Sequence, residues 1–387
     1  MIHRAEPHPL SQKFATFVRD HILGRESWLD GSPPHPLEPI VELGRQGLVH
    51  WWVPESQGGA GLSVRHSIDL VELLAYGDAG IANGLAGRCL AAAALRIYGD
   101  DVQRRNFLAP SATDPSFFGA LAASEEAAGS ELLNTATTAR KASGEYVLNG
   151  VKFVSTGAAL AAFTIVLAAT DDGDLRAFIV PMDAKGVRVV KRWQMAGLRS
   201  YDYSQVAFEN CRIPESSILR GHGVRVVEAV TSAMRPQLAA TAVGIGMRVR
   251  DLCLDYAATK LIKGRPLAEN DVFAAKMGQM EAELSVMQSA CRDAATEFDE
   301  IMRSKDPEQH FHRHGGTKSA IVAKLICGQL GWKIVSVGSE LFGGLGYTQD
   351  HLIFKLVRDM RHVSILEAGD DVIRSLIYGR HCTQVFE

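Results

Sequence analysis

The sequence lacks features that would assign it to several large classes of protein. It has no run of 18 or more apolar residues, so we expect no membrane-spanning helix. Its formal net charge is only −3, and it has no basic stripe of the kind that binds nucleic acid. The start, MIHRAEPHPLSQKF, has no apolar core of a secretory signal. We therefore expect a cytoplasmic protein that binds neither membranes nor nucleic acid, while a local pocket for a small anion stays open.

Paired cysteines and metal-binding patterns are also missing. The six cysteines lie far apart, without a CxxC motif, and this favours small core residues over disulfides or metal ligands. The segment HFHRH (310–314) has no cysteine or carboxylate partner close by, and it stands in a polar stretch with Pro307, Gly315 and Gly316. This composition predicts a solvated loop between helices. We predict no metal.

Three blocks of different texture divide the 387 residues, of which 47% are hydrophobic. Residues 1–113 and 220–387 carry apolar residues at three- and four-residue intervals, which predicts helices. Residues 114–219 contain short β-branched and aromatic runs divided by SG, NG, DDGD and AKG, which predicts an antiparallel β domain. Within it, Asn149-Gly150 has the composition of a tight hairpin turn. The pattern predicts an α+β multidomain chain with an N-terminal helical domain, a central β domain and a C-terminal helical bundle.

Five segments, in chain order, carry specific motifs. They are VPESQGGAGLS (53–63), LAASEEAAGSEL (121–132), LRSYDYSQVAFENCRIPESSIL (198–219), ELFGGLGYTQDHLIFKLVRDMR (340–361) and ILEAGDDVIRSLI (365–377). Together they resemble the acyl-CoA dehydrogenase family, whose members use FAD. The resemblance implies that family's fold, with a four-helix bundle at the C-terminus.

The resemblance also implies the reacting groups. Glu367 stands at the family's catalytic glutamate, and its small neighbours Ala368 and Gly369 leave room for the acyl chain and the flavin. A carboxylate can remove the proton next to a thioester carbonyl if the site is dry and the enolate is stabilised. Arg235 matches an arginine near this carboxylate. The alternatives are a glutamate at a helix N-terminus, favoured by the helix dipole, and an arginine on a solvated helix face.

Further residues match positions that contact FAD in the family. They are Ala122, Ala123 and Ser124 at the isoalloxazine edge, Ser130 near the pyrophosphate and the substrate, Phe153 and Ser155 over the flavin ring, and Gly343 and Gly344 in a turn close to FAD. No GxGxxG opens a βαβ unit, so the flavin site is not of the Rossmann type. Each of these residues could instead serve packing or an ordinary helix-ending turn.

The sequence departs from the family at several ligand contacts. Gly369 replaces a threonine that touches FAD, Asp371 stands at the next contact, and Glu340 replaces a glutamine. Lys260 replaces an arginine that reaches a neighbouring subunit's FAD, and it supplies charge without the planar fork. Ser232 stands where the family has an aspartate that holds the CoA end of the substrate. These changes leave the base intact but weaken the expected CoA contact.

The resemblance implies FAD-dependent α,β-dehydrogenation of an acyl thioester to the trans-2-enoyl product. The acyl group is carried by CoA or by an acyl carrier protein, as in polyketide-pathway members of the family. An electron-transfer flavoprotein or another acceptor, and assembly as a homotetramer or homodimer, are implied as well. Two alternatives stay open. One is a flavin oxidase or monooxygenase on this fold, and the other is a non-catalytic interaction protein that retains it.

Overall fold

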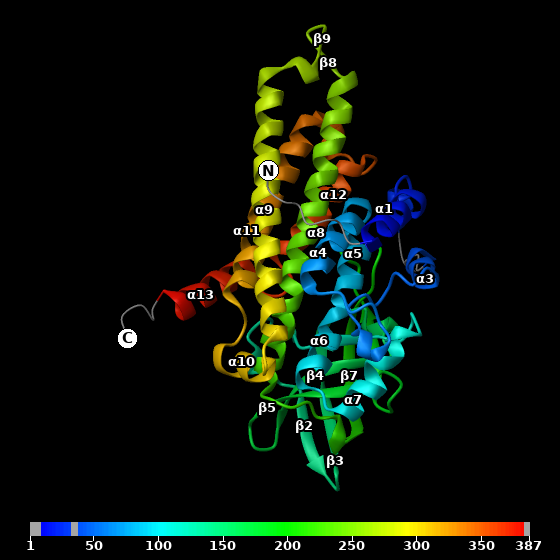
Figure 1. Cartoon of the computed structure of the whole chain (residues 1–387), viewed down its shortest axis with the longest axis vertical. Helices are drawn as coiled ribbons and strands as arrows, with labels where there is room; N and C mark the ends of the chain where they lie inside the picture. Colours follow the sequence, from blue (N-terminus) through cyan, green and yellow to red (C-terminus); the bar gives the residue numbers. More distant parts are fainter. Residues whose placement is uncertain (1–8, 32–37, 383–387) are drawn as a thin grey trace.

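The computed structural model describes residues 9–31 and 38–382. Residues 1–8, on which part of the expectation of no secretory signal rests, lie outside this range. Long helices form an elongated bundle, the N-terminal helices pack along one side of it, and the β sheet lies at one end (Figure 1). The predicted fold class is confirmed.

The N-terminal helices are short, and three of them begin at a polar side chain that caps the helix. They are α1 (Pro9–His21), α2 (Glu26–Leu29), α3 (Glu38–Arg45), α4 (Val64–Gly77), α5 (Ala79–Gly87), α6 (Cys89–Tyr98) and α7 (Asp101–Phe107), with 3-10 turns η1 (Glu55–Gln57) and η2 (Ala109–Ala112). The Asp78 carboxylate begins α5 by accepting a bond from the Ile81 amide at 2.9 Å. Asp100 and Gln103 form a capping box at α7.

The β domain contains one seven-stranded sheet. Its strands are β1 (Gly119–Ala122), β2 (Thr138–Ala142), β3 (Glu145–Thr156), β4 (Phe163–Thr170), β5 (Leu175–Pro181), β6 (Val187–Arg192) and β7 (Tyr203–Pro214), with η3 (Leu132–Asn134), η4 (Ala158–Leu160) and η5 (Glu215–Ser217). The order is β1-β4-β2-β3-β7-β6, with β5 also paired to β4. Most pairs are antiparallel as predicted, but β4 pairs in parallel with both β1 and β2.

The predicted hairpin at Asn149-Gly150 is wrong. Strand β3 runs through both residues, with an irregular register against β7 at this point. Gly150 allows a close approach, because a Cβ there would lie 2.4 Å from the Thr137 hydroxyl oxygen. The turn lies instead at Ser143-Gly144, where both residues have positive φ and join β2 directly to β3.

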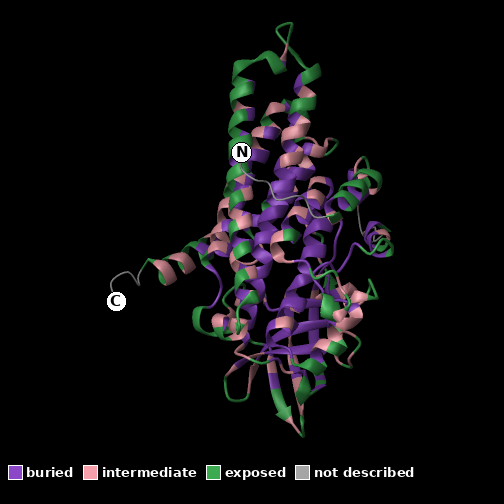
Figure 2. Cartoon of the chain, viewed as in Figure 1, coloured by how far each residue is buried: buried purple, intermediate pink, exposed green. Residues whose placement is uncertain are grey.

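The C-terminal region is a bundle of long helices. It comprises α8 (Gly223–Thr259), α9 (Asp271–Arg303), α10 (Pro307–His314), α11 (Lys318–Leu341), α12 (Leu352–Met360) and α13 (Asp370–His381), with β8 (Leu261–Ile262), β9 (Arg265–Pro266), η6 (Leu267–Glu269), η7 (Gly343–Tyr347) and η8 (Arg361–Ser364). The middle of α8 is buried, whereas the β8–β9 end of the bundle is exposed (Figure 2). Among the described helices, α11 is long and apolar enough to cross a bilayer, but it packs against α8, α9 and α12 as a core helix.

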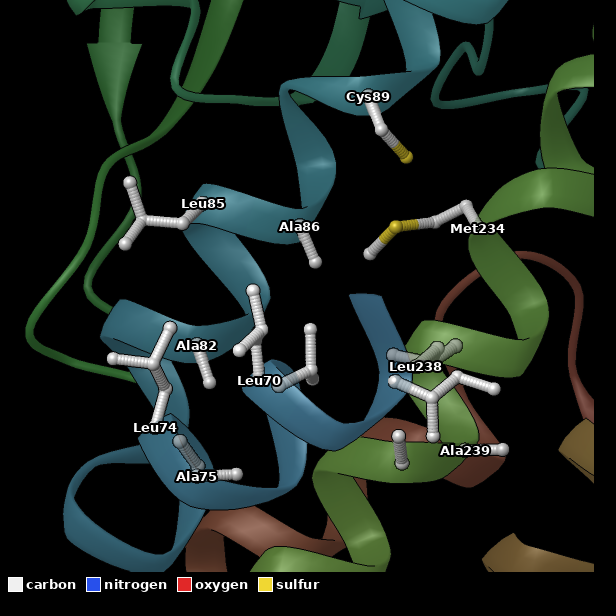
Figure 3. Close-up of a cluster of buried hydrophobic side chains, with 14 of the residues drawn as sticks. Leu70, Leu74, Ala75, Ala82, Leu85, Ala86, Cys89, Met234, Leu238 and Ala239 are labelled. Atoms are coloured by element: carbon white, nitrogen blue, oxygen red, sulfur yellow. The ribbon is translucent and has the colours of Figure 1, made fainter. Parts of the chain in front are cut away.

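The core joins the N-terminal helices to the bundle. Side chains of α4, α5 and α6 face the middle of α8, and Cys89 points toward Met234 across this contact (Figure 3). The six cysteines are unpaired, and only Cys382 is exposed. Cys291 and Cys327 bring their Sγ atoms to 3.8 Å between α9 and α11.

The predicted loop around HFHRH is wrong, because these residues belong to α10. Asp306 caps this helix by accepting a bond from the Gln309 amide at 2.9 Å, and Pro307 follows at its first position. Gly315, with φ 68, ends it. The rings of His310 and His314 face each other at 4.9 Å on one side of the helix.

Candidate active site

Glu367 lies in the short connection between η8 and α13. Its φ is 55 and that of the next residue, Ala368, is 83. A left-handed conformation costs a residue with a Cβ about 1–2 kcal/mol, so two in succession require firm support from their surroundings. Strain of this kind concentrates at functional sites, which makes this connection a candidate site on geometry alone.

The carboxylate of Glu367 is enclosed and incompletely partnered. Its Oε2 atom is buried and has no hydrogen-bond partner within the described residues. Burial raises the pKa of Glu367 to about 7, although the positive charges of Arg235 and Lys324 lower it. A carboxylate with a pKa near neutrality can take up a proton from a weak carbon acid and can release it again.

Arg235 comes from the buried middle of α8 and lies beside this base. Its Nη2 donates to the Glu367 carbonyl oxygen at 3.4 Å, and its Nε atom has no partner in the described part of the chain. Burial lowers the pKa of Arg235, and the charge of Glu367 opposes that effect. The predicted catalytic residue and one predicted substrate residue are therefore brought together.

The hydroxyl of Ser232, one turn before Arg235 on α8, is engaged within the protein. It donates to the Glu228 carbonyl at 2.8 Å and accepts from the Thr317 amide at 3.1 Å. Gly316 lies against it, since a Cβ there would be 3.3 Å from the Ser232 Oγ. The Ser232 hydroxyl thus holds the α10–α11 connection by a hydrogen bond. It offers no carboxylate, unlike the aspartate expected at this position.

A second group of predicted residues gathers in the β domain. Ala122 ends β1, Ala123 and Ser124 follow it, and the Phe153 amide on β3 donates to the Ser124 carbonyl at 2.9 Å. The Phe153 ring meets the Trp193 ring edge-on with centroids 4.9 Å apart. The Ser155 hydroxyl is buried and lacks a partner among the described residues. Strand β3 thus carries one ring of an aromatic pair and an unused hydroxyl, and the other ring follows the end of β6.

A buried ion pair, which the motif comparison did not single out, holds this group in place. Lys152 Nζ donates to Glu125 Oε1 at 2.8 Å and to the Ala123 carbonyl at 3.0 Å. Burial opposes the charge of Glu125, but its bonds to Lys152 and Thr137 lower its pKa to about 2. Ser130, in contrast, lies in the exposed turn that follows.

A third group lies at the far end of the bundle. Lys260 ends α8 just before the β8–β9 hairpin, and Glu340, Gly343 and Gly344 lie at the end of α11 (Figure 1). The two places are joined by the rings of Tyr256 and Phe342, 4.5 Å apart. A 37-residue helix is about 55 Å long, so a single chain does not bring Lys260 to the β domain at the other end of α8.

Two predicted cofactor residues follow Glu367 directly. Gly369 is partly buried at the N-cap of α13. Asp371 is exposed in the first turn of the helix and pairs with Arg374 at 2.5 Å. Gly369 therefore lies beside the base, whereas the Asp371 side chain points toward solvent.

The sequence analysis missed two groups near the base. Lys324, buried in α11, donates to the Ala368 carbonyl at 2.6 Å. Cys89 accepts a bond from Gln237 at 3.0 Å, and burial, with a contribution from Glu367, raises its pKa to about 12. A charged residue inside the apolar pattern of KSAIVAKLICGQL was the available signal for Lys324. No comparable signal marked Cys89.

Comparisons with known proteins agree along the whole chain. Models of the acyl-CoA dehydrogenase N-terminal, middle and C-terminal domains match residues 5–114, 120–211 and 221–382. The chain is 27% identical over 368 residues to an acyl-CoA dehydrogenase of Bacillus subtilis (strain 168), which covers 93% of this chain and 94% of that protein.

Solved structures of an acyl-CoA dehydrogenase and of an acyl carrier protein oxidase share the fold of this chain. An acyl-CoA dehydrogenase of Bacillus anthracis complexed with FAD matches with a TM-score of 0.88 at 23% identity, over 96% of this chain and 65% of that one. The prolyl acyl carrier protein oxidase AnaB matches with a TM-score of 0.84 at 20% identity, over 95% and 97%.

Proposed function

The chain belongs to the acyl-CoA dehydrogenase family, and on that premise we propose that this oxidoreductase desaturates an acyl thioester to its trans-2-enoyl form. The observation that carries the proposal is the enclosed Glu367 carboxylate, with a pKa raised to about 7 and Arg235 beside it. In this reaction Glu367 takes the proton from the α-carbon. The two electrons of the β-carbon–hydrogen bond leave with that hydrogen as hydride, and the double bond forms.

FAD is the cofactor of this family, and the residues present fit it. The Ser155 hydroxyl is buried with no partner among the described residues, and it lies two positions after Phe153, whose ring meets that of Trp193. These residues, with the backbone of Ala122, Ala123 and Ser124, would hold the flavin ring. When bound, FAD supplies the acceptor for the hydride.

The remaining residues position the substrate and exclude water. The Glu367 amide is proposed to polarise the thioester carbonyl, and Ser130 is proposed to contact the substrate. The Arg235 guanidinium supports the base through the carbonyl oxygen of Glu367. Its Nε has no partner in the part of the chain that the structure describes, so this buried cation retains a donor for a bound group.

We propose an acyl carrier protein rather than CoA as the acyl carrier. Ser232 uses its hydroxyl within the protein, where the family has an aspartate for the CoA end. The resemblance in fold to a prolyl acyl carrier protein oxidase also supports an acyl carrier protein as the carrier. Polyketide biosynthesis is one setting in which such a substrate would occur. Turnover of one acyl group on CoA and on carrier protein tests this, and a clear preference for CoA would overturn it.

The proposed partners follow from the same reading. An electron-transfer flavoprotein or similar acceptor would reoxidise the enzyme in the cytoplasm. Lys260 lies at the opposite end of α8 from the β domain, which supports a homotetramer or homodimer in which it reaches a second copy's FAD. Sedimentation of wild type and Lys260→Ala, with FAD content measured in each, tests that role. Unchanged FAD retention in Lys260→Ala would contradict it.

Anaerobic bleaching of the flavin by a panel of acyl thioesters tests the reaction itself. General base catalysis contributes about 10²–10⁴-fold, so Glu367→Gln should slow bleaching by that factor. Glu300→Gln, an exposed carboxylate on α9, is the matched control and should bleach like wild type. Full activity of Glu367→Gln would overturn the assignment of the base.

The same experiment separates the alternatives. Rapid reoxidation of the bleached protein by air would favour an oxidase, although the retained Glu367 counts against that class. A colourless protein that FAD cannot reconstitute would favour a non-catalytic interaction protein.

A further inference from the structure

One face of α11 follows the segment that leads to Glu367. A Cβ at Gly331 would lie 2.5 Å from the Met360 sulfur, and a Cβ at Gly328 would lie 2.9 Å from the Ser364 hydroxyl oxygen. One turn further toward the N-terminus of α11, Lys324 contacts the connection that carries Glu367. Positions 324, 328 and 331 share one helix face, so this face of α11 packs along residues 360–370.

Lys324 contacts this connection on the C-terminal side of the base. Its Nζ donates to the Ala368 carbonyl at 2.6 Å and to Asp370 Oδ1 at 3.2 Å. Its side chain is fully buried, so its charge is held by these two acceptors rather than by water. Burial lowers the pKa of Lys324, and its bond to Asp370 opposes this. Breaking either contact leaves a buried polar group incompletely paired, which is costly.

The connection needs support at this point. Glu367 and Ala368 both have left-handed backbones, a conformation that residues with a Cβ leave readily when nothing holds them. On the other side, Arg235 donates to the carbonyl oxygen of Glu367, and this 3.4 Å bond is long. The short bond from Lys324 to the next carbonyl therefore contributes most to fixing the peptide between Glu367 and Ala368.

We propose that Lys324 is a positioning residue that holds the Glu367 carboxylate at the reacting carbon by clamping the Ala368 carbonyl and Asp370. The inference rests on the proposed function, because it concerns the same base. Lys324 touches neither substrate nor cofactor in this role; it acts through the backbone of its neighbour. Misplacement of a reacting group by about 1 Å can cost 10²-fold in rate, so a clamp of this kind has a measurable effect.

Charged and titratable groups face Glu367 from three helices. They are Arg235 of α8, Lys324 of α11 and Cys89 of α6. Asp370 faces Lys324 rather than Glu367. Removing the Lys324 charge takes away one of the two cations that stabilise the ionised base. The pKa of Glu367 should then rise, and the rate should reach its plateau at a higher pH.

The test compares Lys324→Met, Lys324→Gln and Asp370→Asn with wild type, all loaded with FAD. Lys324→Met should lower kcat about 10–100-fold with a small change in KM, and should shift the pH midpoint of kcat upward. Lys324→Gln keeps a donor for the Ala368 carbonyl, so it should retain more of kcat while showing the same pH shift. Asp370→Asn should have the smallest effect on kcat. Lys13→Met, which replaces an exposed lysine on α1, is the control and should match wild type.

A second readout does not depend on turnover. The pH at which the thermal midpoint responds to ionisation of Glu367 should rise in Lys324→Gln as well. If Lys324→Met does not fold, Lys324→Gln and Asp370→Asn decide the matter by the same criteria.

The outcomes separate this inference from the proposed function. Wild-type kcat, KM and pH midpoint in folded Lys324→Met or Lys324→Gln, with Glu367→Gln inactive, would overturn the clamp and leave the function standing. A lower thermal midpoint with unchanged kcat per bound flavin would show that Lys324 is merely structural. Full activity of Glu367→Gln, or an inactive wild type, would overturn both.

Discussion

Two buried lysines, Lys355 and Lys324, stand in regions with opposite electrostatic designs. Lys355 on α12 pairs with Asp359 at 2.6 Å and with Asp78 at 3.0 Å. Asp359 accepts the Leu198 amide at 2.7 Å, and Asp78 accepts the Ser200 hydroxyl. Burial disfavours the Lys355 ammonium, but the two carboxylates outweigh it and raise its pKa. This network ties the N-terminal helices, the β domain and the bundle together.

The region around Lys324 is not closed in this way. Lys324 has one carboxylate and one carbonyl as partners, and its pKa is lowered by burial. Within residues 9–31 and 38–382, an enclosed oxygen of the nearby Glu367 carboxylate and the Nε atom of Arg235 have no hydrogen-bond partner. In the Lys355 network the cation and the carboxylates pair with one another. Around Glu367, by contrast, a carboxylate oxygen and a guanidinium N–H are left over to interact with a bound group.

The contrast shows how a buried charge can be assigned a role. Buried ionisable groups are structural when their partners neutralise them, and they are candidates for chemistry when the fold leaves them strained or unpaired. Glu367 is a candidate for chemistry by this criterion. Its backbone is left-handed and therefore strained, and its pKa is raised to about 7.

Breaking the closed network should have the largest effect on stability. Lys355→Met leaves Asp78 and Asp359 buried without their cation, which costs about 3–5 kcal/mol. Thermal or urea unfolding would measure the loss, with the exposed Lys13→Met on α1 expected within about 0.5 kcal/mol of wild type. The double variant Lys355→Met/Asp359→Asn should recover part of the loss, because one uncompensated charge is removed. Equal stability of Lys355→Met and Lys13→Met would contradict the comparison.

Much of this organisation could be predicted from the sequence. The motif segments identified the fold class and placed Glu367 and Arg235 together, because residue types needed by one reaction recur at fixed places in a fold. Asp359, which lies in one of these segments (340–361), belongs to the closed network. Arg358 pairs with Asp30 and donates to the Ala196 carbonyl at 2.6 Å.

The missed features depend on contacts distant in sequence or on overlooked local signals. The role of Lys324 comes from a carbonyl 44 positions further along the chain, which no local pattern reports. Gly150 is needed for the close approach of Thr137, so the Asn-Gly composition was misread as a turn. Helix α10 was missed although Asp306-Pro307 is a recognisable helix start. The roles of the flavin-facing residues stay predictions.

Replacing Glu367 by glutamine should have an intermediate effect on the free energy of unfolding, and this effect should depend on pH. The folded pKa of Glu367, about 7, lies above its usual value of 4.5, so the folded state binds this proton more tightly than the unfolded state. Its contribution to stability is fully present below pH 4.5 and is lost as the pH rises through about 7. Relative to wild type, Glu367→Gln should therefore gain about 3 kcal/mol between pH 4.5 and pH 8.

Thermal midpoints of both proteins across this pH range, with FAD and without substrate, would check the sign. Glu300→Gln is the control and should follow wild type at every pH. A midpoint difference between Glu367→Gln and wild type that is independent of pH would show that Glu367 ionises at its ordinary pKa in the fold.

The smallest effect concerns backbone strain next to the base. Ala368 has φ 83, where glycine has no steric penalty, so Ala368→Gly should stabilise the fold by about 0.5–1 kcal/mol after the entropy of glycine is counted. Ala161 has an ordinary φ of −79, and Ala161→Gly should destabilise by a similar amount. Opposite shifts of the unfolding midpoint would locate the strain at the Glu367 connection. If both variants were destabilised equally, Ala368 would store no strain, and the contrast between the two regions would rest on charge alone.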